Sequence, residues 1–165
     1  SDSYKIAIKN EYNVINKGIE NYNTNEQFDL ISFWASLEYC MNIDLVIKQI
    51  KKLLKKGGIL LIYISGNPSS LIMRVLKEKC LGFVFNRGNY FSPNSLNMLF
   101  KKNKFKKIYQ KSFISEIEVI SNFLDYNESY HKPTKNSMAK SFSKELEELI
   151  LKNLMGYKFL TIFKK

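Results

Sequence analysis

The most constraining feature of the sequence is an unbroken apolar run directly after two glycines. Gly57 and Gly58 precede Ile59–Ile64, a run of aliphatic residues and one tyrosine. A strand without polar alternation is typical of a parallel sheet covered by helices on both faces. The run is much shorter than the roughly 20 apolar residues that a membrane-spanning helix requires. We therefore predict a layered α/β fold around this strand and no membrane association.

Patterns of helix and strand alternate on both sides of this run. Apolar residues spaced by 3.6 positions from Ile43 to Leu54 predict an amphipathic helix that Gly57 and Gly58 end. The compact apolar run Phe28–Phe33 predicts a strand. Further patterns predict helices over 2–10, from Ser92-Pro93, over 116–124 and over 143–154. They also predict strands at 14–15, 105–113 and 157–163. Asp125–Ser141 is polar.

Length and composition favour one globular domain over residues 1–165. The chain is 45% hydrophobic and 25% charged, which is the profile of a folded protein. Cys40 and Cys80 lie far apart, and the single histidine, His131, has no partner at metal-ligand spacing. These residues predict neither a disulfide framework nor a metal site, and they favour a cytoplasmic location.

The formal charge of +11 raises the alternative of a nucleic-acid-binding protein. Only Arg74 and Arg87 are arginines, and the lysines are spread along helix faces and chain ends. Lysines in this distribution usually form a solvated surface. We therefore do not expect nucleic acid as a partner; steep salt dependence of RNA or DNA binding would test this alternative.

Three blocks of sequence, in this order, point to a known family. They are Phe28–Ile31 with Ser36-Leu37-Glu38-Tyr39; Leu53–Ile62 around Gly57-Gly58; and Gly66-Asn67 followed by Asn89-Tyr90-Phe91-Ser92-Pro93-Asn94-Ser95-Leu96. The blocks resemble the second half of class I S-adenosylmethionine-dependent methyltransferases, of the type related to ubiquinone-biosynthesis O-methyltransferases. The family has Leu-Glu-His where this chain has Leu37-Glu38-Tyr39, so Tyr39 replaces the histidine. In the third block the family has His-x-x-x-Phe-Ser-x-x-Ser-Leu. Gly156–Phe163 is similar to the family's last, antiparallel strand.

The resemblance implies a Rossmann-like sheet, mostly parallel with an antiparallel last strand. It also implies an N-terminally incomplete, truncated domain, because the family's glycine-rich turn and the acidic end of its second strand have no counterpart here. Val14-Ile15 would be the family's third strand, about 14 Å from the Phe28 strand if two strands are missing between them. We therefore expect no pairing of Val14 and Ile15 with Leu30 and Ile31. The segment before Asn21 should be poorly ordered or paired with another chain.

The function that the resemblance implies is methyl transfer from S-adenosylmethionine to a small molecule or a sugar. Such a transfer depends mainly on aligning the nucleophile with the methyl carbon, so few catalytic groups are expected. The implied residues are Ser1, Ile19, Glu20, Phe33 and Trp34 for the cofactor, Asn67, Arg74, Asn89 and Tyr90 for the substrate, and Tyr39 as the catalytic hydrogen-bonding group. The alternative is a non-catalytic remnant or accessory chain whose surface binds a partner.

Overall fold

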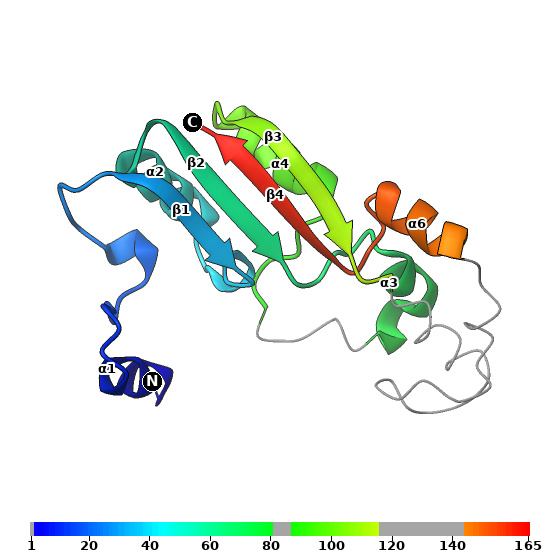
Figure 1. Cartoon of the computed structure of the whole chain (residues 1–165), viewed down its shortest axis with the longest axis horizontal. Helices are drawn as coiled ribbons and strands as arrows, with labels where there is room; N and C mark the ends of the chain where they lie inside the picture. Colours follow the sequence, from blue (N-terminus) through cyan, green and yellow to red (C-terminus); the bar gives the residue numbers. More distant parts are fainter. Residues whose placement is uncertain (1, 81–86, 116–143) are drawn as a thin grey trace.

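The computed structural model describes residues 2–80, 87–115 and 144–165 (Figure 1). Its elements are α1 (Asp2–Lys9), η1 (Ile19–Asn21), β1 (Phe28–Trp34), η2 (Leu37–Tyr39), α2 (Ile43–Leu53), β2 (Leu54–Ile64), α3 (Leu71–Leu76), η3 (Lys77–Lys79), α4 (Pro93–Lys102), β3 (Lys106–Phe113), α6 (Lys144–Lys152) and β4 (Lys158–Lys164). The helix predicted over 116–124, the polar stretch after it, His131 and Ser1 lie outside the described residues.

The strands form one sheet in the order β1-β2-β4-β3. β1 and β2 are parallel, with Phe33 opposite Ile62, and β4 runs antiparallel to both β2 and β3. Three strands therefore share one direction and the last strand of the chain opposes them. The predicted fold class, a Rossmann-like sheet with an antiparallel last strand, is confirmed.

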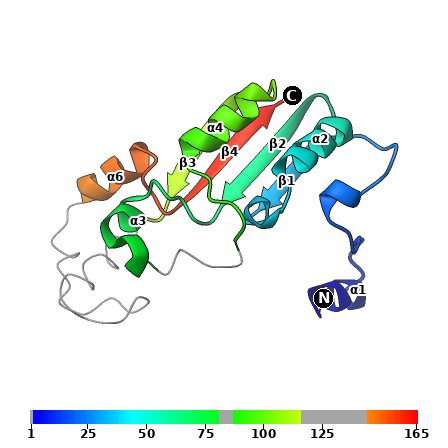
Figure 2. The same ribbon diagram turned by 180° about the vertical axis from the view of Figure 1, so that it is seen from behind.

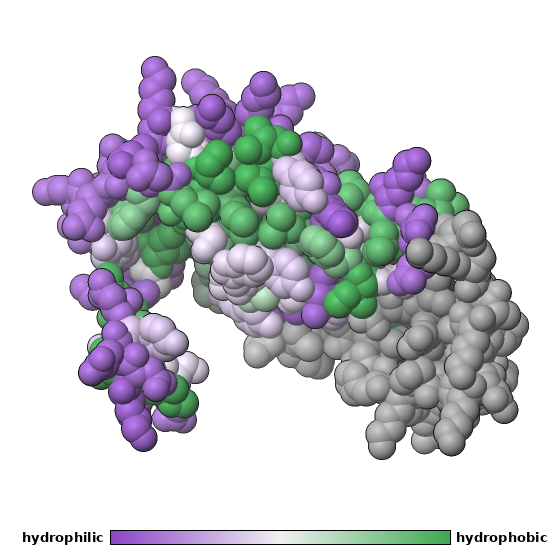
Figure 3. All heavy atoms as spheres, viewed as in Figure 1, coloured by the Kyte–Doolittle hydropathy of each residue, from purple (hydrophilic) through white to green (hydrophobic). Residues whose placement is uncertain are grey.

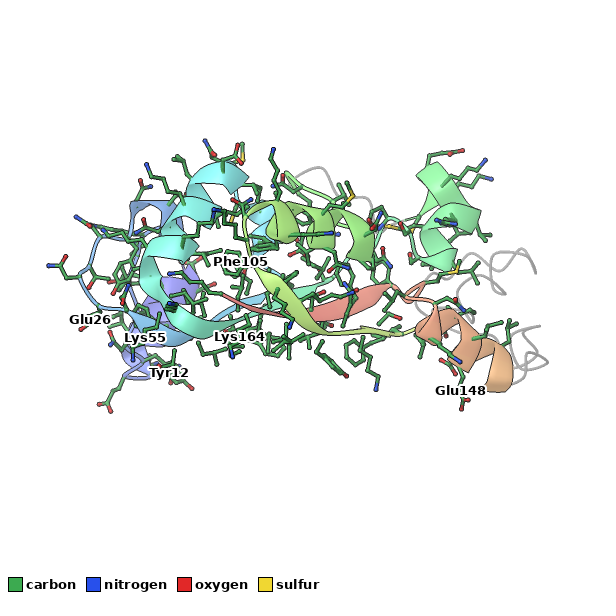
Figure 4. All side chains as sticks on the ribbon, turned by 90° about the horizontal axis from the view of Figure 1, so that it is seen from above. Tyr12, Glu26, Lys55, Phe105, Glu148 and Lys164 are labelled. Carbon is green, nitrogen blue, oxygen red and sulfur yellow. The ribbon has the colours of Figure 1, made fainter. Side chains whose placement is uncertain are left out.

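Two helices, α2 and α4, cover the same face of this sheet (Figures 2 and 4). On that face Leu60, Ile62 and Ile64 of β2 are fully buried, together with Phe159 and Phe163 of β4. The phenyl ring of Phe163 stacks on that of Phe100 from α4, at 4.8 Å between centroids. This layer of strands and two helices holds the main core of the protein.

The other face of the sheet exposes apolar side chains (Figure 3). Trp34, Tyr63 and Leu160 lie opposite one another there, and Leu61, Ile162 and Tyr109 form the neighbouring row. The prediction that β2 is covered on both faces is therefore wrong for the part of the chain described here. The physical reason is that none of the described helices packs over this face, which we call the open face.

The helix α2 begins and ends by local signals. The side chain of its N-cap, Asn42, accepts a hydrogen bond from the N–H of Leu45, and Val46, Ile47 and Ile50 are buried. The helix ends at Leu53 because Leu54 already has extended backbone angles, so the predicted end at Gly57 and Gly58 is wrong.

The two glycines instead lie inside β2. Phe28 of β1 pairs with Leu54 and Leu30 pairs with Ile59, so β2 has extra residues at this point. Gly57 has φ +78°, a conformation that glycine adopts without steric cost, and Gly58 follows it. The glycines therefore allow a bulge that brings Ile59 into register with β1.

The strand predicted at Val14-Ile15 is also wrong. These residues have no regular secondary structure, and within the described ranges β1 pairs only with β2. Val14 and Ile15 do not pair with Leu30 and Ile31, and the expectation that the segment before Asn21 is poorly ordered or paired with another chain stays a prediction. The backbone N–H and carbonyl groups of a strand need hydrogen-bond partners on a neighbouring strand. Figure 1 shows that this segment instead leads away from the sheet to α1.

The helix predicted from Ser92-Pro93 is confirmed as α4. The side chains of Ser92 and Ser95 exchange hydrogen bonds with each other's backbone N–H groups, and Pro93 occupies the first turn. Leu96 and Phe100 are buried and Leu99 is partly buried against the core. The predicted strands before and after it are confirmed as β1, β3 and β4, and the last predicted helix as α6.

Candidate active site

The carboxyl ends of β1 and β2 lie side by side and bring two loops together. Ligands of open α/β sheets usually bind at this edge. After β1, Ala35 turns the chain with φ +46° while its N–H donates to the carbonyl of Tyr63 at 2.9 Å. This turn leads into η2, which carries Glu38 and Tyr39.

Glu38 connects η2 to the end of β2. Its side chain is fully buried, and Oε1 accepts hydrogen bonds from the N–H of Ser65 at 2.9 Å and from Ser65 Oγ at 3.3 Å. The other carboxylate oxygen, Oε2, is buried and receives no hydrogen bond from any described residue. A buried carboxylate oxygen without a donor is costly, so it marks a strained or functional position.

Arg87 belongs to the same group of hydrogen-bonded side chains as Glu38 and Ser65. Its Nη2 donates to Ser65 Oγ at 3.2 Å. The guanidinium carbon lies 5.9 Å from the ring centroid of Tyr39 and 5.3 Å from that of Tyr90, so two aromatic rings flank the cation. A Cβ on Gly66 would lie 1.9 Å from Nη1, which explains why only glycine leaves room for this arginine.

The segment that carries Arg87 is fixed to η2 by backbone and side-chain bonds. Asn89 donates its N–H to the carbonyl of Glu38 at 3.0 Å and its Nδ2 to the carbonyl of Cys40 at 2.6 Å. The structure thus brings together the predicted residues Tyr39, Asn89 and Tyr90. Tyr39 is 44% exposed and therefore accessible from solvent.

Sequence reasoning missed Glu38 and Arg87 in this cluster. A signal for Arg87 was present: it stands four residues before Phe91, where the related family has the histidine of His-x-x-x-Phe-Ser. Glu38 belongs to the block that matches Leu-Glu-His, but its burial against Ser65 depends on the packing of two distant segments.

Asn67 and Arg74 lie apart from the cluster. Asn67 is fully buried, donating Nδ2 to the carbonyls of Leu154 and Gly156 at 3.0 and 2.9 Å, while its Oδ1 accepts from the N–H of Ser69 at 2.9 Å. These bonds fix the residues before β4. Arg74 lines a separate groove of about 460 Å³ with Ser69, Pro93, Asn94, Asn97, Lys107, Gln110, Asn153, Leu154 and Met155.

The residues predicted for the cofactor take different positions at the sheet edge. Phe33 is buried in the core, whereas Trp34 is 62% exposed on the open face with its ring centroid 5.7 Å from that of Tyr63. Ile19 packs against the core, and Glu20 beside it is exposed. Ser1 lies outside the described residues.

Burial raises the pKa of the Cys40 thiol, and the negative charges of Glu20 and then Glu38 raise it further. Glu20 of η1 is therefore close enough to η2 to act on it electrostatically. Residues 2–80, 87–115 and 144–165 contain no cluster of three histidine, cysteine or acidic side chains that could hold a metal ion. No helix in these ranges has the length and apolar character needed to cross a membrane.

Comparison with known proteins gives a family and a set of similar folds. A family model described as a methyltransferase domain matches residues 2–110. No curated protein matches the chain. Its fold is similar to that of a SAM-dependent methyltransferase from Thermotoga maritima, described as a possible histamine N-methyltransferase (17% identity, TM-score 0.65, 100% of this chain and 69% of that one).

Two further solved structures are similar in fold. One is a SAM-dependent methyltransferase from Archaeoglobus fulgidus, with 14% identity, a TM-score of 0.59, and coverage of 100% of this chain and 73% of that one. The other is an S-adenosylmethionine-dependent methyltransferase from Clostridium acetobutylicum, with 10% identity, a TM-score of 0.52, and coverage of 99% and 69%. At these identities the likeness establishes the fold of the chain.

Proposed function

The chain belongs to the methyltransferase domain family, and we propose that it transfers a methyl group from S-adenosylmethionine to a small molecule or a sugar. The description of the Thermotoga maritima protein as a possible histamine N-methyltransferase supports an acceptor of small size. The sugar alternative depends on the resemblance of the Phe91-Ser92 block to sugar-modifying relatives.

The observation that best supports the proposal is the gathering of Tyr39, Arg87, Asn89 and Tyr90 at the carboxyl ends of β1 and β2. This edge is the usual ligand site of such sheets. The cluster combines aromatic rings, an amide and a charge, so it can orient a polar acceptor. Orientation is the main requirement of methyl transfer, because the nucleophile must approach the methyl carbon in line with the leaving group.

The residues at the edge fit one side of the cofactor. When bound, S-adenosylmethionine supplies a methyl group on a positively charged sulfur. The exposed ring of Trp34 would offer an aromatic face to that charge, and Ile19 and Glu20 would lie beside the adenine. Phe33 fits less well because its ring is buried in the core. Ser1 stays a prediction.

For the acceptor, Tyr39 is the residue we propose as the hydrogen-bonding group. Its phenol can donate to or accept from a hydroxyl or amine of the substrate, and its side chain is accessible. Tyr90 would line the same side, and Asn89 would hold the segment in place through its bonds to Glu38 and Cys40. For Arg74 we propose contact with a longer acceptor through the separate groove, and Asn67 would support its wall.

Calorimetric titration with S-adenosylmethionine tests the proposal. The titration compares this chain with the product of its full reading frame, each with Trp34→Ala and with Tyr109→Ala as a matched change of an exposed aromatic on the open face. We expect Trp34→Ala to weaken binding by about tenfold or more, and Tyr109→Ala to leave it unchanged. Binding by the product of the full reading frame alone would keep the function and place part of the site outside these 165 residues. No binding by either protein would contradict the proposal.

A further inference from the structure

The groove that Arg74 lines lies where α3, α4, β3 and the residues after α6 meet. Its volume of about 460 Å³ is in the range in which proteins bind small molecules. Most of its lining is polar, and the polar side chains are Ser69, Arg74, Asn94, Asn97, Lys107, Gln110 and Asn153. Two of these side chains are cations, and none of the described residues in the lining is acidic. The groove therefore offers positive charge together with uncharged hydrogen-bonding groups.

The two cations of the groove, Arg74 and Lys107, have no charged partner. In the part of the chain that the structure describes, neither forms an ion pair, and the guanidinium of Arg74 makes no hydrogen bond. Both side chains are exposed to solvent. The planar fork of the Arg74 guanidinium is therefore available to two oxygens of a carboxylate or a phosphate.

The position of Lys107 is set by the floor of the groove. Its Nζ donates to Gln110 Oε1 at 3.2 Å, and Asn97 Nδ2 donates to the same oxygen at 3.0 Å. Gln110 Nε2 donates to Thr161 Oγ1 at 2.8 Å, and Thr161 is fully buried in β4. These bonds attach the floor to the sheet and place the ammonium before a ligand arrives. The amide of Gln110 carries no charge, so it leaves the positive charge of Lys107 without a counter-charge.

We infer that this groove binds a small hydrophilic anion through a phosphate or carboxylate group, with Arg74 and Lys107 as the charged contacts. The guanidinium would bind two oxygens at once, and the ammonium would act as a point charge. The exposed amide of Asn94 can bind further polar atoms of the ligand. The site does not depend on methyl transfer. For an acceptor that reaches the groove, an assignment that rests on the proposed function, it specifies an anionic end.

The rival explanation is that Arg74 and Lys107 are part of the solvated surface of a chain with a formal charge of +11. Such a surface attracts anions diffusely, and the loss of any exposed lysine weakens the attraction to a similar extent. A ligand site saturates and depends on its own side chains. Lys102 is the matched control, because it is exposed at the end of α4 and does not line the groove.

Nuclear magnetic resonance can follow the groove through its amide side chains. The NH₂ signals of Asn94, Asn97 and Gln110 would be followed in isotope-labelled protein during titration with inorganic phosphate and, separately, with sodium acetate. Chloride keeps the ionic strength constant. Asn103, the C-cap of α4, donates Nδ2 to the carbonyl of Leu99 and does not line the groove, so its NH₂ signal is the internal control.

We expect saturating shifts of the groove amides with phosphate, acetate or both, and no saturating shift of Asn103. The anion that gives the tighter response identifies phosphate or carboxylate as the group that the groove binds. Anion affinity should fall by about tenfold or more in Arg74→Gln and by several-fold in Lys107→Gln. Lys102→Gln removes the same charge from the protein and should leave the affinity nearly unchanged.

Linear shifts equal to those caused by chloride would overturn the inference, as would an equal loss of affinity in Arg74→Gln and Lys102→Gln. S-adenosylmethionine binding is measured separately, without the added anions. If the cofactor binds and the groove amides do not respond, the inference fails and the proposed function stands. If the amides respond and neither this chain nor its full reading frame binds the cofactor, the anion site stands and its link to a methyl acceptor fails.

Discussion

The N–H of Ser65 donates to Glu38 Oε1 at 2.9 Å, and this bond joins the loop after β1 to the residue that follows β2. We expect Glu38→Ala to lower the free energy of unfolding by about 1–3 kcal/mol, because a part-buried N–H loses its acceptor. Glu38→Gln keeps Oε1 as an acceptor and should cost less. Urea unfolding of both variants measures the difference, with Glu26→Ala, exposed at the rim in Figure 4, as the control. A larger loss in Glu38→Gln than in Glu38→Ala would contradict this reading of the bond.

A second prediction concerns Asn67, whose amide makes three hydrogen bonds inside the protein. Replacing it with alanine should leave two carbonyls and one N–H without their partner and reduce stability by about 1–3 kcal/mol. Asn94→Ala, at an exposed position in the separate groove, should change stability by less than about 0.5 kcal/mol. Thermal unfolding compares the two, and equal melting temperatures would show that the amide of Asn67 does not hold the start of β4.

A third prediction contrasts two glycines. A Cβ on Gly156 would lie 2.6 Å from the backbone oxygen of Phe113, so Gly156→Ala must displace a strand and should cost about 1–3 kcal/mol. A Cβ on Gly66 would meet the end of the Arg87 side chain, which can move. Gly66→Ala should therefore retain most of the stability. Similar unfolding midpoints for the two variants would refute the contrast.

A fourth prediction follows from the thiol of Cys40. In a Cys80→Ala variant, the rate of alkylation should rise with a midpoint above pH 9.0, because burial and then Glu20 and Glu38 raise the Cys40 pKa above that ordinary value. Glu20→Gln should lower the midpoint toward 9.0. A midpoint that Glu20→Gln leaves unchanged would mean that η1 does not approach η2.

The same shift affects stability at alkaline pH. The unfolded thiol releases its proton near pH 9.0 and the folded thiol releases it only at higher pH. The contribution of the protonated Cys40 thiol to the free energy of unfolding is therefore fully present below pH 9.0. It is lost as the pH rises through the raised pKa of the thiol in the folded protein. Cys40→Ser should lessen that loss.

The sequence predicted those parts of the fold that local patterns determine. The apolar spacing of α2, the Ser92-Pro93 start of α4 and the apolar runs of β1 and β2 all agree with the structure. The end of α2 was misplaced because Gly57 and Gly58, which resemble a helix stop, serve a bulge in β2. The helix α3 was not predicted, since six residues after the Ser70 cap show too little periodicity.

The site was only partly predictable, for a different reason. Tyr39, Asn89 and Tyr90 were predicted from the resemblance of their blocks, and they lie near one another in the structure, while their roles stay predictions. Arg87 is positioned by Ser65, 22 residues earlier, and by a ring from η2, and no local pattern encodes such contacts. The strand expected at Val14-Ile15 failed for a related reason, because strand formation requires a neighbour that the residues themselves do not specify.

The position of β4 has a consequence for how the protein is made. The last strand of the chain lies between β2 and β3, and the N–H and carbonyl of Lys165 still bond to Gly58 and Gly57. β2 and β3 therefore cannot join one sheet until Lys158–Lys164 has been synthesised and has paired with both of them. These pairings link segments that lie far apart in the sequence, and such contacts are slow to form. Deletion of Lys158–Lys164 would remove the strand that joins β2 to β3.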